Sequence, residues 1–349
     1  MATPEALETA EDLDDEAMRR RPSRRTRTLT RAISGYQVRF GVHSIQNTRD
    51  KMEDAHCAKV GMEEADSTGV CNDTAGAASD EAVSPRGVVG RPSLGSFSYF
   101  AVFDGHSGAQ AAEFCKKHLD EWLAHDHELL LADPAGALRS AFARAEKEWH
   151  AYALEDPNNE KMDGTTAAVA LLDRAAGSCV VGNVGDSEVL LGTRDSSGVV
   201  SIRTLTEVHH VKRSESEADR IKALGGRVKH SRLCHPKFSP EVLSLSVSRA
   251  IGDIFFKDAK FTDGRPSGLT AEPYITSVEV CASDVVEQFL LIGCDGLWDT
   301  VKYQEAADFV FAKLNSGEDP QMISEGLVHL AREAGSSDNI TVMVVLLAT

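Results

Sequence analysis

Six short motifs of this chain carry acidic residues, and most of those with an Asp-Gly or Gly-Asp step end an apolar run. The motifs are RDKMEDA (49–55), YFAVFDGHSG (99–108), NVGDS (183–187), SVSRAIGD (246–253), FLLIGCDGLWD (289–299) and GSSDNITVMVV (335–345). Four of them contain an Asp-Gly or Gly-Asp step. One such step is usually an ordinary turn, but several at strand ends can direct their carboxylates toward a shared metal ion. Their joint occurrence therefore predicts a metal centre.

The donor atoms of these motifs favour a hard cation. The candidate ligands are Glu53, Asp54, Asp104, Asp186, Asp253, Asp295 and Asp338. The residue after Asp104 is Gly105, which has no Cβ, so the backbone can turn sharply and its carbonyl can approach a cation as a further ligand. No cluster of Cys or His accompanies the acids, and a set of oxygens selects Mg²⁺ or Mn²⁺ over zinc or copper.

Two further side chains suit the hydrolysis of a phosphate ester. Two cations about 3.5–4 Å apart can acidify a shared water and hold it in line with phosphorus. Arg49 can bind the phosphate oxygens through its bidentate fork, and His106 can give a proton to the leaving alkoxide. For His106 alone a structural role would be the better explanation. Beside the metal-binding Asp-Gly step, catalysis is favoured.

The sequence lacks the motifs of other group-transfer chemistries. It contains no C-x₅-R, G-x-S-x-G, G-x-x-x-x-G-K-[ST] or H-E-x-x-H pattern and no dinucleotide-binding glycine fingerprint. Thiolate-phosphatase, acyl-transfer, kinase-type and hydride-transfer chemistry therefore have no support.

The composition is typical of a soluble globular protein. The chain has 349 residues, of which 42% are hydrophobic and 26% charged, enough for one large domain or two ordinary ones. Its formal charge of −17 argues against a nucleic-acid partner. Seven cysteines without a C-x-x-C pair favour a reducing compartment, and no apolar run approaches the roughly 18 residues of a membrane span. We expect a monomer in the cytoplasm or nucleus.

Two segments differ from the rest in composition. Residues 1–31 join an acidic half to an arginine block, Arg19–Arg31, and predict a disordered charged tail. The block suits a nuclear address, a lipid surface or an acidic partner, and a merely solvated tail is the simplest alternative. Residues 61–97 are poor in large apolar side chains and predict a disordered insertion. Residues 32–349 are otherwise predicted to form a single domain.

Blocks of strands alternate with pairs of helices, which predicts an α+β fold rather than regular strand–helix alternation. The predicted strands are 36–43, 98–103, 166–173, 178–186, 187–194, 288–293 and 339–347. The predicted helices are 107–131, 134–154, 216–224, 302–315 and 319–334.

In this order the motifs resemble those of the metal-dependent Ser/Thr protein phosphatases, the PPM or type 2C family, over about residues 36–347 without the insertion at 61–97. The resemblance implies a four-layer α-β-β-α sandwich of two antiparallel sheets flanked by helix pairs. It also implies hydrolysis of phosphoserine and phosphothreonine in proteins by direct attack of a metal-activated water.

The resemblance also suggests a role for each motif residue. It implies that Asp104 bridges two Mg²⁺ or Mn²⁺ ions, that Gly105 adds its carbonyl, and that Asp295 and Asp338 are direct ligands. Other positions match residues of secondary or catalytic roles. They are Glu53 and Asp54 (ligands through water), Asp186 and Asp253 (a weaker third ion), Arg49 (phosphate), His106 (general acid) and 209–243 (a substrate-facing flap).

The chain departs from the family pattern at several positions. Ser107 stands where the family usually has glycine, and Glu188 stands where arginine is common. The segment LTEVHHVKR (205–213) keeps His209, but Val208 replaces an aspartate and His210-Val211 replaces a Lys-Pro pair, so the anchoring of the flap is open. A pseudophosphatase that only binds partners is the alternative function. Since every core acid is present, an active phosphatase is favoured.

Overall fold

The computed structural model describes residues 38–63, 93–156, 158, 161–281 and 285–347. The predicted charged tail (1–31) and most of the predicted insertion (64–92) lie outside these ranges. All described residues belong to one compact unit that begins at Ala32.

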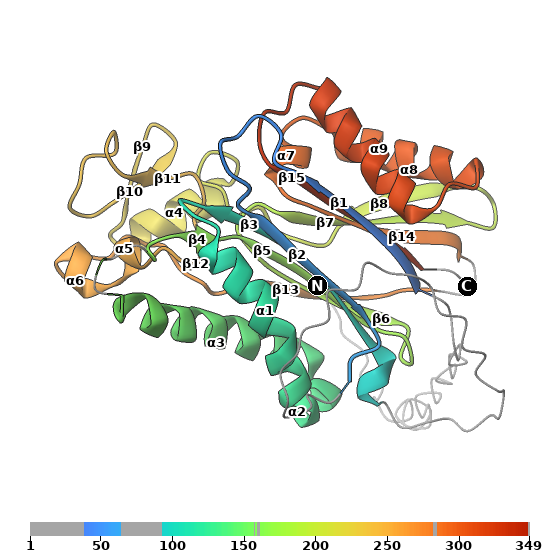
Figure 1. The fold of residues 1–349 in the computed structure, drawn as a ribbon, viewed down its shortest axis with the longest axis horizontal. Coiled ribbons are helices and arrows are strands. Elements are labelled where there is room, and N and C mark those ends of the chain that lie inside the picture. Colours follow the sequence, from blue (N-terminus) through green and yellow to red (C-terminus); the bar gives the residue numbers. More distant parts are fainter. Residues whose placement is uncertain (1–37, 64–92, 157, 159–160, 282–284, 348–349) are drawn as a thin grey trace, which may run out of the picture. The chain divides into compact units, whose positions relative to one another are not determined.

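Two large antiparallel sheets form the centre of this unit (Figure 1). The first has five strands in the order β1 (Val38–Ile45), β15 (Ile340–Leu347), β14 (Val285–Gly293), β7 (Glu188–Asp195) and β8 (Val200–Thr204). The second contains β12 (Ile251–Gly252), β4 (Gly164–Thr165), β3 (Phe97–His106), β5 (Ala167–Asp173), β6 (Ser178–Val184) and β13 (Tyr274–Glu279) in this order, with β2 (Asp54–Val60) paired to β3. A small third sheet has the order β11 (Ser244–Leu245), β10 (Arg232–Cys234), β9 (Arg227–Lys229).

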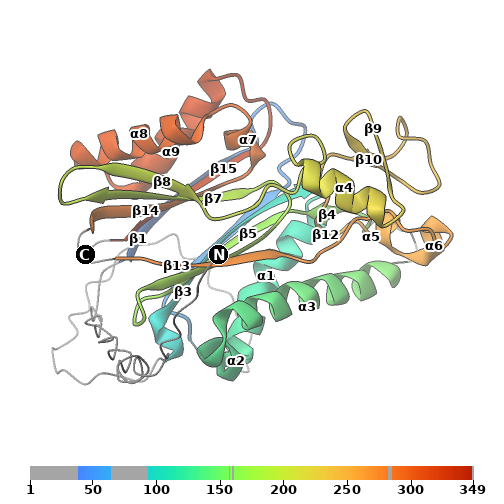
Figure 2. The same ribbon diagram turned by 180° about the vertical axis from the view of Figure 1, so that it is seen from behind.

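Helices cover the outer faces of the two large sheets (Figures 1 and 2). The second sheet carries α1 (Gln110–His125), α2 (His127–Ala132) and α3 (Pro134–Leu154), and the first carries α8 (Tyr303–Asn315) and α9 (Pro320–Glu333). Shorter helices are α4 (Glu215–Ala223), α5 (Ile254–Lys257), α6 (Ala259–Thr262), α7 (Asp295–Trp298) and the 3-10 turn Leu94–Ser96. The predicted α-β-β-α architecture is confirmed. Within the described ranges, no helix combines the length and apolar character that a membrane crossing requires.

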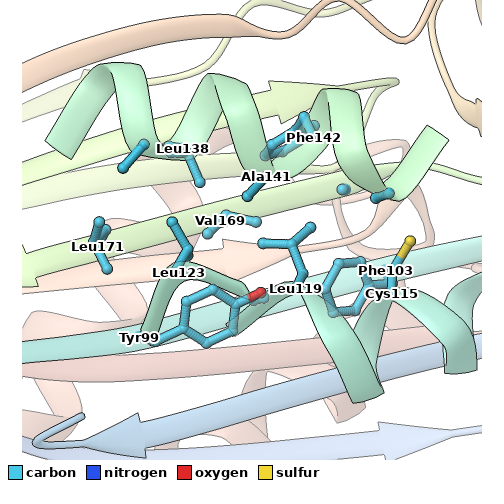
Figure 3. Close-up of a cluster of buried hydrophobic side chains, with 14 of the residues drawn as sticks. Tyr99, Phe103, Cys115, Leu119, Leu123, Leu138, Ala141, Phe142, Val169 and Leu171 are labelled. Carbon is cyan, nitrogen blue, oxygen red and sulfur yellow. The ribbon is translucent and has the colours of Figure 1, made fainter. Parts of the chain in front are cut away.

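The continuous apolar run of β3 follows from burial on both of its faces. Tyr99 and Phe103 pack with Leu119 of α1 on the helix side, as Figure 3 shows. The alternate residues Phe100 and Val102 pack into the layer between the sheets. A strand held this firmly fixes the direction of the residues at its end, where Asp104 lies.

One predicted helix, 107–131, is shorter and divided in the structure. Ser107 and Gly108 have positive φ angles of 61° and 145°, which a right-handed helix does not allow, so α1 begins at Gln110. Asp126 ends it, and α2 follows. The other predicted boundaries agree to within a few residues; α3, for example, starts at Pro134 after the cap that Asp133 provides to the amide of Gly136.

Candidate metal centre

Acidic residues from both large sheets meet at one end of the sandwich. Asp54 and Asp104 are direct cross-strand partners at the adjoining ends of β2 and β3. Asp295, the first residue of α7 at the end of β14, is hydrogen-bonded to Asp104. Donor atoms of Asp54, Asp104 and Cys294 lie within 4.8 Å of one another. Like charges directly across a strand pair are destabilising, so this arrangement calls for a cation.

Burial and mutual repulsion raise the pKa of the clustered carboxyls. Burial is the largest cause of each pKa shift. Neighbouring carboxylates raise the pKa further, and hydrogen bonds oppose the rise. The pKa of Asp104 is raised well above its ordinary value, since Asp295 and Asp54 add to its burial. The pKa values of Asp54 and Asp295 are raised to about 6, and that of Asp186 to about 8. Oδ1 of Asp54 is buried with no hydrogen-bond partner. A hard dication would supply the missing positive charge, and the oxygen donors fit Mg²⁺ or Mn²⁺.

Cys294 orders the acids and is a poor metal ligand. Burial, followed by the charges of Asp54 and Asp104, raises the pKa of its thiol well above the ordinary value, so it stays protonated. Its Sγ donates to Asp54 and accepts the amide of Thr341 at 3.2 Å. The hydroxyl of Thr341 also donates to Oδ2 of Asp54 at 2.7 Å. The sequence motifs did not single out Cys294 or Thr341. The only signal in the sequence was that Cys294 precedes Asp295 and Thr341 follows Asp338 by three positions.

Asn339 holds the segment that carries Arg49 and Glu53. Its Oδ1 accepts the amide of Glu53 at 2.8 Å, and its Nδ2 donates to the carbonyls of Gln46 and Lys51, each at 2.9 Å. Arg49 forms an ion pair with Asp338, and its side chain remains 54% exposed. A guanidinium that is tied at one nitrogen and open to solvent can still bind phosphate oxygens.

Gly105 is required by a close approach of the backbone. A Cβ at this position would lie 2.4 Å from the carbonyl oxygen of Glu53, which accepts a hydrogen bond from the amide of Gly105 at 3.2 Å. The side chain of Glu53 is half-buried. The absence of a Cβ thus lets the two strand ends, and the acids on them, come together.

His106 is oriented by Asp253. Its Nε2 lies 2.7 Å from Oδ2 of Asp253, and Gly164 leaves the space for the pair. Although burial opposes it, the charge and hydrogen bond of Asp253 raise the pKa of His106. The structure therefore places Asp253, predicted as an acid of a weaker third ion site, against the imidazole. Asp163, which the sequence did not single out, accepts the amide of Ala111 at 2.7 Å at the start of α1.

Glu188 has a partner from the flap. Its buried carboxylate accepts Nη2 of Arg213 at 2.9 Å and the hydroxyl of Tyr303 at 2.5 Å. Arg213 also reaches Oδ1 of Asp299 at 3.3 Å. Arg213 comes shortly after Val208, which replaces the aspartate usual in the family. The ion pair has its negative member, Glu188, on β7 and its positive member, Arg213, on the flap.

A second ionic contact anchors the flap through α4. Glu217 is bound by Arg220 (Nη2–Oε2 2.8 Å), by Arg249 (Nη2–Oε1 2.8 Å) and by the hydroxyl of Ser248 at 2.6 Å. Burial would raise the pKa of Glu217, but these hydrogen bonds lower it well below the ordinary value. His210 adds a local contact, because its Nδ1 accepts the amide of Lys212 at 3.0 Å. The flap is therefore held despite the altered segment 208–211.

Comparison with known proteins decides the family. The family described as Protein phosphatase 2C matches residues 38–340. The chain belongs to this family. Human protein phosphatase 1F is 34% identical over 324 residues, which cover 91% of this chain and 59% of that protein. The probable protein phosphatase 2C 22 of Arabidopsis thaliana is 33% identical over 314 residues, which cover 89% of this chain and 69% of that protein. The predicted family is confirmed.

Two solved structures share the fold. A serine-threonine phosphatase 2C from Toxoplasma gondii has a TM-score of 0.64 at 21% identity, over 90% of this chain and 96% of that one. A sex determining protein of C. elegans has the same TM-score and identity, and the match covers 90% of this chain and 65% of that one. The chain spans less than two thirds of the length of the first curated relatives it matches, about 59% for the human protein.

Proposed function

We propose that this protein is a Mg²⁺- or Mn²⁺-dependent phosphatase that hydrolyses phosphoserine and phosphothreonine in proteins. The observation that carries the proposal is the meeting of Asp54, Asp104 and Asp295 at one end of the sandwich. Arg49 and His106 belong to segments that reach the same end. Membership of the phosphatase family agrees with this assignment.

Asp54, Asp104 and Asp295 would hold the cations, with Asp338 and the carbonyl of Gly105 as further donors. Bound dications supply an acidified water and offset the charge of the phosphoryl group. The buried, unpartnered Oδ1 of Asp54 and the raised pKa values support loading by cations rather than a purely structural role.

Arg49 and His106 would act on the substrate itself. The charges of Asp338, Asp295 and Asp104 raise the pKa of Arg49 against the opposing effect of burial, so its guanidinium stays charged beside the acids. Nε2 of His106 faces Asp253. Its Nδ1, which no described residue bonds, is then the atom that holds the proton for the leaving serine or threonine oxygen.

The alternative is a pseudophosphatase that binds phosphoproteins without hydrolysing them. The test is hydrolysis of p-nitrophenyl phosphate and a phosphothreonine peptide by dialysed protein, before and after addition of millimolar Mn²⁺ or Mg²⁺. We expect activity that depends on the added ion. Asp104→Asn should keep the wild-type circular dichroism and lose at least about a hundredfold in kcat, because a neutral amide cannot balance two dications. Metal-loaded wild type that hydrolyses neither compound would favour the binding role.

A further inference from the structure

The hairpin of β9 and β10 is a basic surface on an acidic protein. Residues 221–240 contain five lysines and arginines and no acidic residue, although the whole chain carries a formal charge of −17. Figures 1 and 2 show this hairpin at one end of the molecule, beyond β4 and next to α4 and α5. The hairpin is therefore an electrostatic exception and a candidate for recognition of an anion.

The pairing of the strands puts its cations on one face. Lys229 is directly opposite Arg232, and Val228 is directly opposite Leu233. Because side chains alternate along a strand, Arg227 shares the face of Lys229 and Arg232. All three are exposed, whereas Leu233 is buried in the flap's apolar cluster and Val228 packs against it. The apolar face thus fixes the hairpin and leaves these three cationic side chains outward, while Cys234, opposite Arg227, is buried.

This arrangement is unfavourable for the isolated fold. Two cations directly opposite across a strand pair repel each other, and the hairpin places Lys229 and Arg232 in that position. An anionic ligand between them would remove the repulsion. The repulsion between these two side chains therefore does not help to stabilise the hairpin.

The two arginines are held in place without being neutralised. Nη2 of Arg227 donates to the carbonyls of His235 and Pro236 at 2.9 and 3.3 Å. Arg232 donates from Nε to the hydroxyl of Ser244 at 2.8 Å and from Nη2 to its carbonyl at 2.7 Å. In the described part of the chain neither arginine has a carboxylate partner, and each keeps free N–H donors. Ordered guanidinium groups with spare donors lose little entropy when they bind an anion.

A hollow of about 490 Å³ lies along the same hairpin. Its lining includes three cations, Lys222 of α4, Arg227 and Lys229, and no acidic residue. Lys222 pairs with Asp219 at 2.9 Å and Lys229 with Glu241 at 3.2 Å, but all four side chains are more than half exposed. Such surface pairs are worth little, so a bound carboxylate can displace them.

Both ends of the flap lead toward the candidate metal centre. Arg213 near its start bonds Glu188 and Asp299 and is acted on by the charge of Asp186. After the flap, β11 ends at Leu245, and the chain then reaches Asp253, the partner of His106. A substrate chain that leaves the centre in extended form advances about 3.3 Å per residue. A substrate segment that runs from the centre along the flap would therefore present the residues next to its phosphorylated residue to the hairpin.

We propose that the cationic face of β9–β10, together with Lys222, binds a run of Asp and Glu residues that flanks the phosphorylated residue of the substrate. This surface would select acidic phosphoprotein segments for the reaction at the metal centre. The inference rests on the proposed phosphatase function and adds its substrate class.

The test compares phosphothreonine peptides that differ only in three flanking residues, Glu, Gln or Lys, on either side of the phosphothreonine. Wild type should show a kcat/KM about tenfold higher for the best Glu peptide than for its Lys counterpart, as expected for three exposed charge contacts. Raising the salt to about 1 M should nearly abolish the preference, because the Debye length then falls to about 3 Å. Equal rates on all peptides at low salt would overturn the proposal.

Charge reversal locates the surface. Lys222→Glu/Lys229→Glu should lose or invert the preference, and Lys222→Gln/Lys229→Gln should reduce it about threefold. The control Lys117→Glu/Lys147→Glu makes the same change in net charge on exposed lysines of α1 and α3 and should keep the wild-type preference. An equal effect of the control would show that the field of the whole protein, not the hairpin, selects the peptide.

Two further arms separate the possible failures. Asp104→Asn with fluorescein-labelled phosphopeptides measures affinity by anisotropy without turnover, and the Glu peptide should bind about tenfold more tightly than the Lys peptide. This arm tests the surface even if the wild type proves inactive. A peptide with three phosphoserines in place of Glu tests the other anion. Selection of that peptide alone, with no gain from Glu, would overturn the assignment to carboxylates.

Discussion

The contact of Glu188 with Arg213 offers a sharp test of how the flap is anchored. Glu188 is 1% exposed, and Arg213 reaches it from the flap with a side chain that is 29% exposed. Two unit charges about 4 Å apart attract by about 4 kcal/mol at an effective dielectric constant of 20. Desolvation of both groups offsets part of this attraction, so we expect a net coupling free energy of about 2 kcal/mol.

The two single substitutions should differ in cost. Arg213→Gln leaves a buried carboxylate with Tyr303 as its main remaining donor, and should lower the free energy of unfolding by about 3 kcal/mol. Glu188→Gln keeps an oxygen that can accept from Arg213 or Tyr303, and should cost about 1 kcal/mol. Glu188→Gln/Arg213→Gln should cost about 2 kcal/mol less than the sum of the two singles.

The pH dependence provides a second check. Burial raises the pKa of Glu188 above 4.5, against the hydrogen bond of Tyr303 and the charge of Arg213. Removal of Arg213 should raise this pKa further. A carboxyl whose pKa is higher in the folded state loses its contribution to stability as the pH rises through that value. The deficit of Arg213→Gln should therefore grow between pH 5 and pH 8.

Urea denaturation in EDTA measures these differences without the stabilisation that bound metal adds. Arg139→Gln is the matched control, because Arg139 pairs with Glu272 at 3.3 Å while both side chains are more than half exposed, and its removal should have almost no effect. Equal costs for Arg213→Gln and Glu188→Gln, with a coupling near zero, would refute the buried ion pair as an anchor.

Three other predictions concern the centre itself. Asp253→Asn should lower the pKa of His106, because it removes the largest effects that oppose burial, the charge and hydrogen bond of Asp253. It should reduce kcat on phosphoserine peptides about tenfold or more while sparing aryl phosphates, and equal losses on both substrates would contradict a general acid. Gly164→Ala should have a similar effect because its Cβ would lie 2.2 Å from Oδ2 of Asp253, whereas Gly95→Ala, with nothing nearer than 3.9 Å, should be silent in the same assay. The melting temperature of the metal-free protein should fall from pH 5 to pH 8, because Asp54 and Asp295 ionise with pKa values of about 6 and Asp186 with a pKa of about 8. The increase in melting temperature on adding Mn²⁺ should be larger at pH 8. An increase that does not depend on pH would count against these acids as the ligands.

Local sequence was enough to predict the layers and to single out Asp54, Asp104 and Asp295, which the structure brings together. The apolar runs before Asp104 and Asp295 predict buried strands, and a residue at the end of a buried strand has few directions available. The need for a glycine after Asp104 could also be predicted from the sequence, because the close approach that requires it involves only the backbone. The fold class followed from the order of strand and helix blocks.

The partners of the site residues could not be predicted in this way, because they depend on contacts between distant segments. His106 and Asp253 are separated by 147 positions, and Glu188 and Tyr303 by 115. A sequence pattern shows that an acid is present at Asp253 but not that it contacts His106, and its assignment to a weaker third ion stays a prediction. The start of α1 depended on the positive φ of Ser107 and on Asp163, which accepts the amide of Ala111 from 52 positions away. The periodicity of the sequence indicates each helix and strand along the chain. The packing of the two sheets determines which charges come together and which remain apart.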